Sequence, residues 1–276
     1  MKFVPVREAD KKKSYYSYIC EPWIPSAQEI ARLTGKVDQN KTLEFADRRN
    51  CFRPDFVPEP PGCYDLKTGG IVISSTVPVP DITKEMMDWW MVWHQFDPLR
   101  YALWDPQDHY NVSITPEVRA QLLDDSIPME RRLWNAPCTV LESFNGEKPE
   151  INVIRFCDPA KVGYDESLIG TDECLSMICS QDIVKKGPLT IPTAMTEILR
   201  KGPDGTNIWV AHWWMGAVCT GGQDITKKIR MKFMVKKIAK TLIVHNQIEM
   251  THLNKILPEL YKAYGNLPME TECEGA

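Results

Sequence analysis

The sequence of 276 residues lacks any hydrophobic run long enough to cross a membrane. A spanning helix needs roughly 18 or more consecutive apolar residues, and no stretch of this chain reaches that length. The N-terminal segment carries charged residues but no apolar run behind them, which is not the pattern of a secretory signal. We therefore expect a protein with no membrane partner and a cytoplasmic location.

The sequence also lacks an excess of basic residues and any paired-cysteine motif. Lysine and arginine number 33 against 37 aspartates and glutamates, a net charge of −4, which is not the basic footprint of a nucleic-acid binder. The nine cysteines are odd in number, no CxxC occurs, and Cys174 and Cys179 are too isolated from other thiols or histidines to suggest a zinc knuckle. We expect free, buried thiols in a reducing compartment.

What the chain does contain is an ordinary globular composition and an uneven distribution of proline. Hydrophobic residues make up 43% and charged residues 25% of the sequence, and this length can bury a core with room for a ligand cavity. Residues 1–80 are rich in proline and are predicted to form an irregular arm or small subdomain that packs on the rest or on a second subunit. Residues 81–276 are predicted to form the main domain.

Local signals predict helices at both ends of this main domain and strands between them. Thr83 is a good N-cap for a helix that runs to about His94, and Thr115 followed by Pro116 begins another. A long helix is predicted from about Thr226 to Tyr264, with a kink or a separate final turn at Pro258. Turn residues separate β-prone runs at 138–144, 151–156, 175–179 and 208–219. This order predicts an α+β fold with a curved antiparallel sheet around the last helix and a cavity between them.

The last helix places ionisable groups on its apolar face. His245, Glu249 and His252 share the helical spacing of the hydrophobic residues that should face the sheet. A buried carboxylate needs a partner, and a histidine and a glutamate four residues apart can both reach one metal ion. The alternative is a simple hydrogen bond between His245 and Glu249 in a polar groove. His252 can equally replace His245 as the partner of Glu249.

A second group of polar residues follows the first predicted helix. His109 lies in the run WDPQDH, where Asp105 and Asp108 would either orient its ring or only shape a turn. Tryptophans and tyrosines are dense around it, including Tyr101 and Trp104. They would line a pocket or, more commonly for such residues, pack in the core.

Two further ionisable residues lie in predicted strands. Glu142 falls on the mostly apolar face of the strand 138–144, where it is either a functional group or an edge residue in an ion pair. His212 lies beside two tryptophans in the strand 208–219, and it would line the cavity or lie at the surface.

These residues resemble those of a known family. The runs MMDWWMVWH at 86–94, DPLRYALW at 97–104, PQDH at 106–109 and HNQIEM at 245–250 are similar to motifs of the 2,4-diacetylphloroglucinol hydrolases, a family that includes phloretin hydrolases. The resemblance extends over about residues 45–255. One difference is Asp105, which stands where the family pattern has a histidine.

The resemblance implies a helix-grip (Bet v 1-like) domain, a smaller N-terminal part with dimer contacts, and a catalytic zinc. Carried over residue by residue, the implied zinc ligands are His109, Glu142, His245 and Glu249. Tyr101 matches a tyrosine expected to bind an oxygen of the substrate. Asn111 and Trp104 are further candidates for substrate contacts.

The implied activity is hydrolysis of a carbon–carbon bond next to a ketone in an acylated phenolic or polyketide-like molecule. Zinc suits nitrogen and carboxylate ligands, and Mn²⁺ or Fe²⁺ are compatible with the same donors. In such a retro-Claisen reaction we expect Tyr101 to hold an oxygen and His212 to move a proton. A cyclase or isomerase, or a non-catalytic carrier, would use the same cavity without hydrolysis.

Overall fold

The computed structural model describes residues 3–186 and 189–271. Its α-helices are Ala27–Leu33 (α1), Lys84–Trp93 (α2), Pro98–Trp104 (α3), Pro116–Leu123 (α4) and Lys232–Tyr264 (α5). Its strands are Gly62–Asp65 (β1), Ile71–Pro78 (β2), His109–Ser113 (β3), Pro137–Glu142 (β4), Glu150–Arg155 (β5), Ser176–Lys186 (β6), Leu189–Lys201 (β7), Asn207–Met215 (β8), Ala217–Thr220 (β9) and Gln223–Thr226 (β10).

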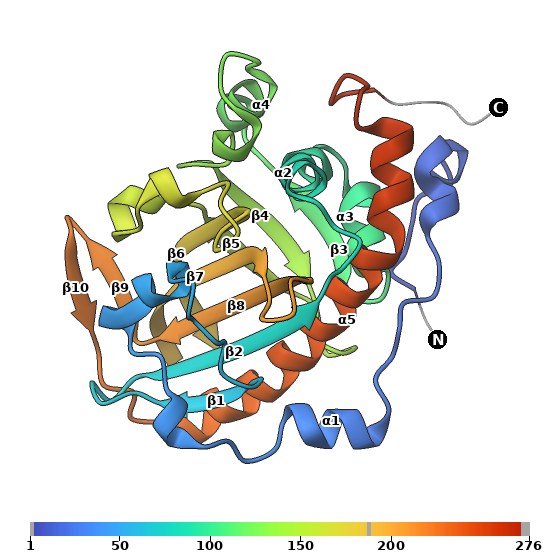
Figure 1. The fold of residues 1–276 in the computed structure, drawn as a ribbon. Helices are drawn as coiled ribbons and strands as arrows, with labels where there is room; N and C mark the ends of the chain where they lie inside the picture. The colour runs from blue at the N-terminus through green and yellow to red at the C-terminus, as the bar shows by residue number, and fades with distance from the viewer. Residues whose placement is uncertain (1–2, 187–188, 272–276) are drawn as a thin grey trace.

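The strands form an antiparallel sheet that lies against the long helix α5 (Figure 1). Five strands pair in the order β1-β2-β8-β7-β6, and three pair in the order β3-β4-β5. A bridge between Phe156 and Ser180 joins the end of β5 to β6. Strands β9 and β10 form a separate hairpin. The mixed architecture with an antiparallel sheet and a long C-terminal helix confirms the predicted α+β class.

Helix α5 is the longest element and is one continuous helix. It begins at Lys232, later than the predicted start, because residues 223–226 pair as β10. Pro258 lies inside the helix, which continues to Tyr264. The prediction of a separate final turn is therefore wrong.

Helix starts follow their capping residues closely. Thr83 accepts a hydrogen bond from the backbone N–H of Met86, and Thr115 accepts one from Val118. Each of these contacts satisfies a backbone donor that the first turn of a helix leaves free. The predicted N-caps of α2 and α4 are confirmed, and both helices begin one residue after them.

The segment 62–78 forms two strands that the sequence did not predict. Strand β2 pairs along its whole length with β8, and β1 pairs with β2. Side chains on both faces of β2 are buried, with Ile71 and Ile73 in one core and Val72 in the other. The prediction that this segment is irregular is wrong, because a strand buried on both faces shows no alternation of apolar and polar residues.

The sheet separates two hydrophobic cores. The larger core lies between the sheet and helices α2, α3 and α5 and contains most of the tryptophans. The smaller one covers the outer face, where Trp214 packs with Phe45 and Cys51 of the N-terminal segment. No helix in the described part of the chain is both long and apolar enough to span a bilayer. The eight cysteines within the described residues are free, while Cys273 lies outside them.

Candidate metal centre and its cavity

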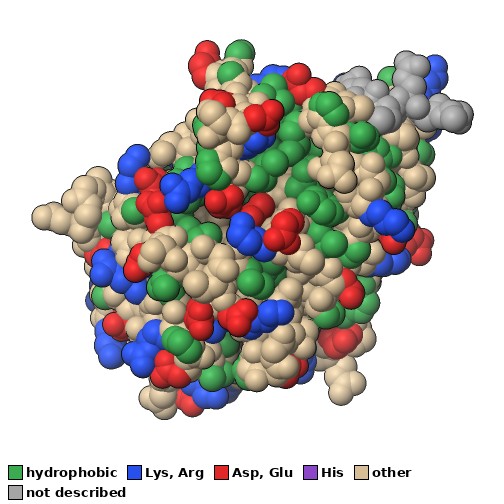
Figure 2. Space-filling model, turned by 45° about the horizontal axis from the view of Figure 1, so that its top comes forward, with side chains coloured by type: hydrophobic (Ala, Val, Ile, Leu, Met, Phe, Trp, Pro, Cys, Tyr) green, Lys and Arg blue, Asp and Glu red, His purple; other side chains and the backbone are tan. Residues whose placement is uncertain are grey.

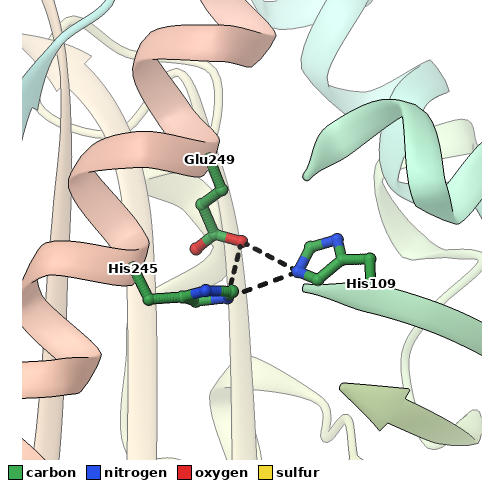
Figure 3. Close-up of side chains that lie close together, drawn as sticks. All are labelled: His109, His245 and Glu249. Carbon is green, nitrogen blue, oxygen red and sulfur yellow. Dashed lines mark hydrogen bonds and ion pairs between the residues drawn. The ribbon is translucent and has the colours of Figure 1, made fainter. Parts of the chain in front are cut away.

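Three side chains from two distant parts of the chain converge in the core (Figure 3). The Nε2 atom of His109, at the start of β3, lies 3.3 Å from the Nε2 atom of His245 on α5. The Oε2 atom of Glu249 lies 3.5 Å from His109 Nε2 and 3.6 Å from His245 Nε2. All three residues are buried.

The spacing of these donor atoms fits a metal ion. Ligand atoms that bind zinc tetrahedrally at about 2.1 Å lie about 3.4 Å from one another. The three observed separations fall within a few tenths of an ångström of that value. Two imidazole nitrogens and one carboxylate oxygen are also a donor set that zinc accepts. The residues present therefore fit a bound divalent cation.

His109 is held so that its Nε2 faces the other two donors. Its Nδ1 lies 3.2 Å from the carbonyl oxygen of Tyr101, to which it can donate a hydrogen bond. That hydrogen bond leaves a lone pair on Nε2, as metal-binding histidines require. Burial, and then the nearby His245, lowers the pKa of His109 well below its ordinary value, which keeps the ring neutral.

His245 is held on its other side by two aspartates. Its Nδ1 lies 3.5 Å from Asp105 Oδ2 and 3.6 Å from Asp108 Oδ2. Asp108 also accepts hydrogen bonds from the Ser143 hydroxyl and from the backbone N–H groups of Asn145 and Gly146. The sequence suggests the two aspartates as partners of the His109 ring, but the structure places both beside His245.

The charges around His245 and Glu249 oppose the effect of burial. Burial alone would lower the pKa of His245, but Glu249, Asp108 and Asp105 raise it to about 10. Burial raises the pKa of Glu249 to about 7, against the effects of His245 and Asn246. A metal cation bound among these groups would compensate the negative charge of the buried carboxylates, as a proton on His245 also would.

The alternative partner on the last helix, His252, lies outside this group. It is fully buried, and its pKa is lowered to about 4, mainly by burial. The structure therefore pairs Glu249 with His245, as the family resemblance implies.

Glu142 lies beside the three donors rather than among them. Its Oε2 accepts a hydrogen bond of 2.7 Å from the Tyr101 hydroxyl, and its Oε1 accepts one of 3.0 Å from Asn152. In the described chain two groups of side chains have ligand atoms close enough to hold a metal ion, His109 with His245 and Glu249, and Asp105 with Asp108 and His245, and Glu142 belongs to neither. Its role as a fourth ligand stays a prediction.

These residues lie at the wall of a cavity of about 470 Å³. Most of its lining is apolar or aromatic and comes from α2, α3, α5 and strands β4 to β8, with Trp104, Phe144, Trp213 and Met215 among the side chains. Tyr101 and Glu142 also line it. All five histidines of the protein are buried. None is visible on the face of the molecule in Figure 2, where hydrophobic side chains lie between acidic and basic ones.

Two predicted site residues lie away from the cavity. His212 is fully buried on the opposite face of β8 from Trp213, and its Nε2 lies 3.1 Å from Glu59 Oε1. Asn111 is exposed on β3 and does not line the cavity. The expectations of a proton-transfer role for His212 and a substrate contact for Asn111 are corrected. Trp104, by contrast, does line the cavity.

The sequence did not reveal Glu197 as a candidate functional residue of the cavity. Glu197 is a buried carboxyl on β7 and lies in the cavity wall beside Thr193 and Met195, on the same face of the strand. A glutamate on an otherwise apolar strand face is the same anomaly that marked Glu142 in the sequence. It went unnoticed because β7 itself was not predicted.

The fold and the site define a mixed α/β protein with a buried candidate metal centre in the wall of an apolar cavity. Residues 43–262 match the family described as the DAPG hydrolase PhiG domain, and the chain belongs to this family. The chain is 33% identical over 264 residues to phloretin hydrolase of Eubacterium ramulus, across 94% of this chain and 93% of that protein.

Two further relatives are 2,4-diacetylphloroglucinol hydrolases. The one from Pseudomonas protegens is 26% identical over 278 residues, with 95% of this chain and 88% of the relative covered. The one from a Pseudomonas species is 25% identical, with 95% and 92% covered. A solved Staphylococcus aureus protein of unknown function aligns with 70% of this chain and 98% of its own, at 8% identity and a TM-score of 0.35, which is too distant to bear on fold or function.

Proposed function

We propose that this protein is a metal-dependent hydrolase that cleaves the carbon–carbon bond between a phenolic ring and its acyl group. The observation that carries the proposal is the convergence of His109, His245 and Glu249 at metal-ligand spacing in the cavity wall. The names of the relatives, hydrolases of phloretin and of 2,4-diacetylphloroglucinol, supply the substrate class. Both named substrates are acylated phenols.

The metal would be held by His109, His245 and Glu249, with Glu142 as a fourth ligand, and zinc suits this donor set best. A bound zinc supplies two kinds of chemistry, because it lowers the pKa of a water molecule and polarises a carbonyl group. The apolar walls of the cavity exclude bulk water and accept the phenolic ring. We propose that the Tyr101 hydroxyl, which donates a hydrogen bond to Glu142, holds an oxygen of the substrate.

The size of the cavity favours an acylated phenol with a substantial acyl chain. A volume of about 470 Å³ lies in the range of cavities that enclose drug-sized ligands, roughly 300–1,000 Å³. Phloretin hydrolase is also more similar to this chain than the two diacetylphloroglucinol hydrolases are. We therefore place an aryl-alkanoyl phenol ahead of a small acetyl phenol as the substrate.

The finer architecture is part of the same proposal. A curved sheet against a long C-terminal helix, with a ligand cavity between them, is the arrangement of helix-grip (Bet v 1-like) domains, and we propose that classification. We also propose a homodimer, as the family resemblance implies. Light scattering coupled to size-exclusion chromatography tests the oligomeric state.

A direct assay tests the activity. The purified protein is loaded with Zn²⁺ and incubated with phloretin or with 2,4-diacetylphloroglucinol, and the released carboxylic acid and deacylated phenol are measured by mass. We expect release of both products, and no release by His245→Ala, whose zinc content should also fall. A product of unchanged mass would instead indicate an isomerase or cyclase. Tight binding without any product would indicate a carrier.

A further inference from the structure

Glu197 of β7 lines the same cavity as the three donors of the candidate metal centre. It lies on β7 between Ile178 of β6 and Ala211 of β8 in the strand register. The neighbouring cavity residues on the sheet are mainly apolar, and they include Ile178, Met195 and Trp213. Glu197 is therefore a buried carboxyl group with mainly apolar neighbours on the sheet, where Asp182 of β6 is a second acidic residue of the lining.

The carboxyl group of Glu197 has no hydrogen-bond partner among the described residues, although the residue is only 6% exposed. The charged groups that act on it are Glu249 and His245 from α5 and Glu142 from β4, all in the same cavity. Burial first, and then the two neighbouring carboxylates, raises the pKa of Glu197 well above its ordinary value. A buried carboxyl in such surroundings favours its neutral form, which carries a proton that it can give.

Several other acids and bases of the cavity wall have hydrogen-bond partners. Glu142 accepts hydrogen bonds from Tyr101 and Asn152, and Asp182 accepts them from the Ser180 hydroxyl and the Arg155 backbone. The two ring nitrogens of His94 lie 2.7 Å from the Trp90 carbonyl oxygen and 2.9 Å from the side-chain nitrogen of Gln95. Of the two buried carboxyls in the cavity wall, Glu249 accepts a hydrogen bond from Asn246, whereas Glu197 has no such partner among the described residues.

We propose that Glu197 is the catalytic acid that protonates the ring carbon from which the acyl group departs. This inference rests on the proposed hydrolysis, and it assigns the proton-transfer role that the sequence had suggested for His212. The three potential metal ligands and Glu197 line one cavity, so a flat phenolic ring between them would have its acyl group toward the ligands and its ring carbon toward Glu197.

The proton and electrons balance in this step. The substrate phenolate uses an electron pair of its ring to take the proton of the Glu197 carboxyl, which forms a new C–H bond and a neutral dienone. Water then adds to the acyl carbon and gives its proton to the Glu197 carboxylate. The bond between ring and acyl carbon breaks, and its electron pair returns to the ring as the product phenolate. The acyl group leaves as a carboxylic acid, and Glu197 is protonated again.

Glu197→Gln tests this assignment, because the amide keeps the shape of the side chain but cannot act as the acid. General acids typically contribute about 10²- to 10⁴-fold to a rate. We expect kcat for the zinc-loaded variant to fall by at least about 100-fold, with KM changed little. The decline in rate at high pH, where the wild-type carboxyl loses its proton, should disappear in the variant. Glu197→Asp should recover part of the activity.

An exchange experiment gives a readout that does not depend on turnover of the substrate. The enzyme is incubated with the deacylated phenol in D₂O, and deuterium uptake at the ring carbon is followed by NMR above the uncatalysed rate. We expect wild-type protein to accelerate this exchange and Glu197→Gln not to do so. Thr196→Val serves as the control for effects on folding, because Thr196 precedes Glu197 on β7 and its side chain lies on the outer face of the strand.

The outcomes separate the two proposals. If wild-type protein releases no acid from either acylated phenol, the proposed hydrolysis is wrong, and with it the role of Glu197. If wild-type protein hydrolyses the substrate while Glu197→Gln keeps its kcat, its pH profile and its exchange rate, only the assignment of Glu197 fails. Loss of zinc or a lowered melting temperature in Glu197→Gln, with kcat restored in the folded fraction, would assign the residue a structural role instead.

Discussion

The ring of Tyr101 stacks on the ring of His109, with centroids 4.0 Å apart and an interplanar angle of 3°. The same tyrosine thus contacts His109 of the candidate metal centre through its ring, and the neighbouring Glu142 through the hydrogen bond from its hydroxyl. These two contacts can be separated by mutation, because phenylalanine keeps the ring and removes only the hydroxyl.

We expect Tyr101→Phe to keep its zinc and lose activity, while Tyr101→Leu loses both. A hydrogen bond to a charged group contributes about 1.5–3 kcal/mol, so removal of the hydroxyl should lower kcat/KM by roughly tenfold to a hundredfold. Zinc content by elemental analysis and steady-state kinetics measure the two effects. Equal zinc loss in both variants would show that the hydroxyl, rather than the stacked ring, supports the metal ligands.

The second prediction concerns Asp108, which positions His245. Replacement by asparagine removes a negative charge near Nδ1 and a favourable acceptor for three hydrogen bonds. Loss of such a supporting contact typically weakens metal binding by about 10- to 100-fold. We expect Asp108→Asn to show this loss in competition with a chromophoric zinc chelator. Asp124→Asn, at an exposed turn, is the matched control and should bind zinc as the wild type does.

The third prediction concerns the stability of the metal-bound protein. Burying the donors of His109, His245 and Glu249 costs less free energy when they bind a cation. Zinc should therefore bind the folded chain far better than the unfolded one. At a zinc concentration about 100 times Kd, stabilisation of about 2.7 kcal/mol follows from linkage. We expect the melting temperature to rise with zinc and to fall with a chelator. Glu249→Gln should show a much smaller shift, and an equal shift would place the zinc elsewhere.

The fourth prediction follows from the buried pair of His212 and Glu59. Burial alone would lower the pKa of His212, but Glu59, and after it Cys51, raise it from 6.5 to about 10. Because the folded-state pKa is the higher one, the stabilisation is fully present below pH 6.5 and is lost as the pH rises toward 10.

Breaking a buried ion pair from one side typically costs about 3–5 kcal/mol. We therefore expect Glu59→Gln to lower the free energy of unfolding by about 3 kcal/mol at pH 6, and by progressively less as the pH approaches 10. Urea denaturation across this pH range measures the difference from wild type. Glu21→Gln, at an exposed position, should show no such trend. A difference for Glu59→Gln that did not vary with pH would contradict the ion pair.

Sequence patterns predicted the features that depend on local chemistry. The starts of α2 and α4 followed from Thr83 and Thr115, because a cap acts within one turn of its own helix. His245 and Glu249 were found because a long amphipathic helix has one apolar face, and polar groups on it stand out. His109 was reached through its surrounding motif, and the structure brings it to the other two.

The errors arise where tertiary packing decides. Strand β7 was missed because Pro192 lies within it, and a proline argues against a strand interior. With β7 missed, the inward face that carries Glu197 could not be defined. His212 was misplaced for a different reason, since every residue of β8 after Asn207 is buried. Such a strand does not reveal from its sequence which face meets the cavity.

The pairing of β2 with β8 has a consequence for how the chain folds. These partners are far apart in the sequence, yet they pair from Ile71 with Met215 to Pro78 with Ile208. Closing so large a loop costs entropy before the contacts repay it, and such topologies fold slowly. Trp213 and Met215 of the cavity wall belong to β8, so the wall is completed only when the two distant segments meet. A nascent chain released before β8 is made would therefore lack the central strand of its five-stranded sheet and part of its cavity wall.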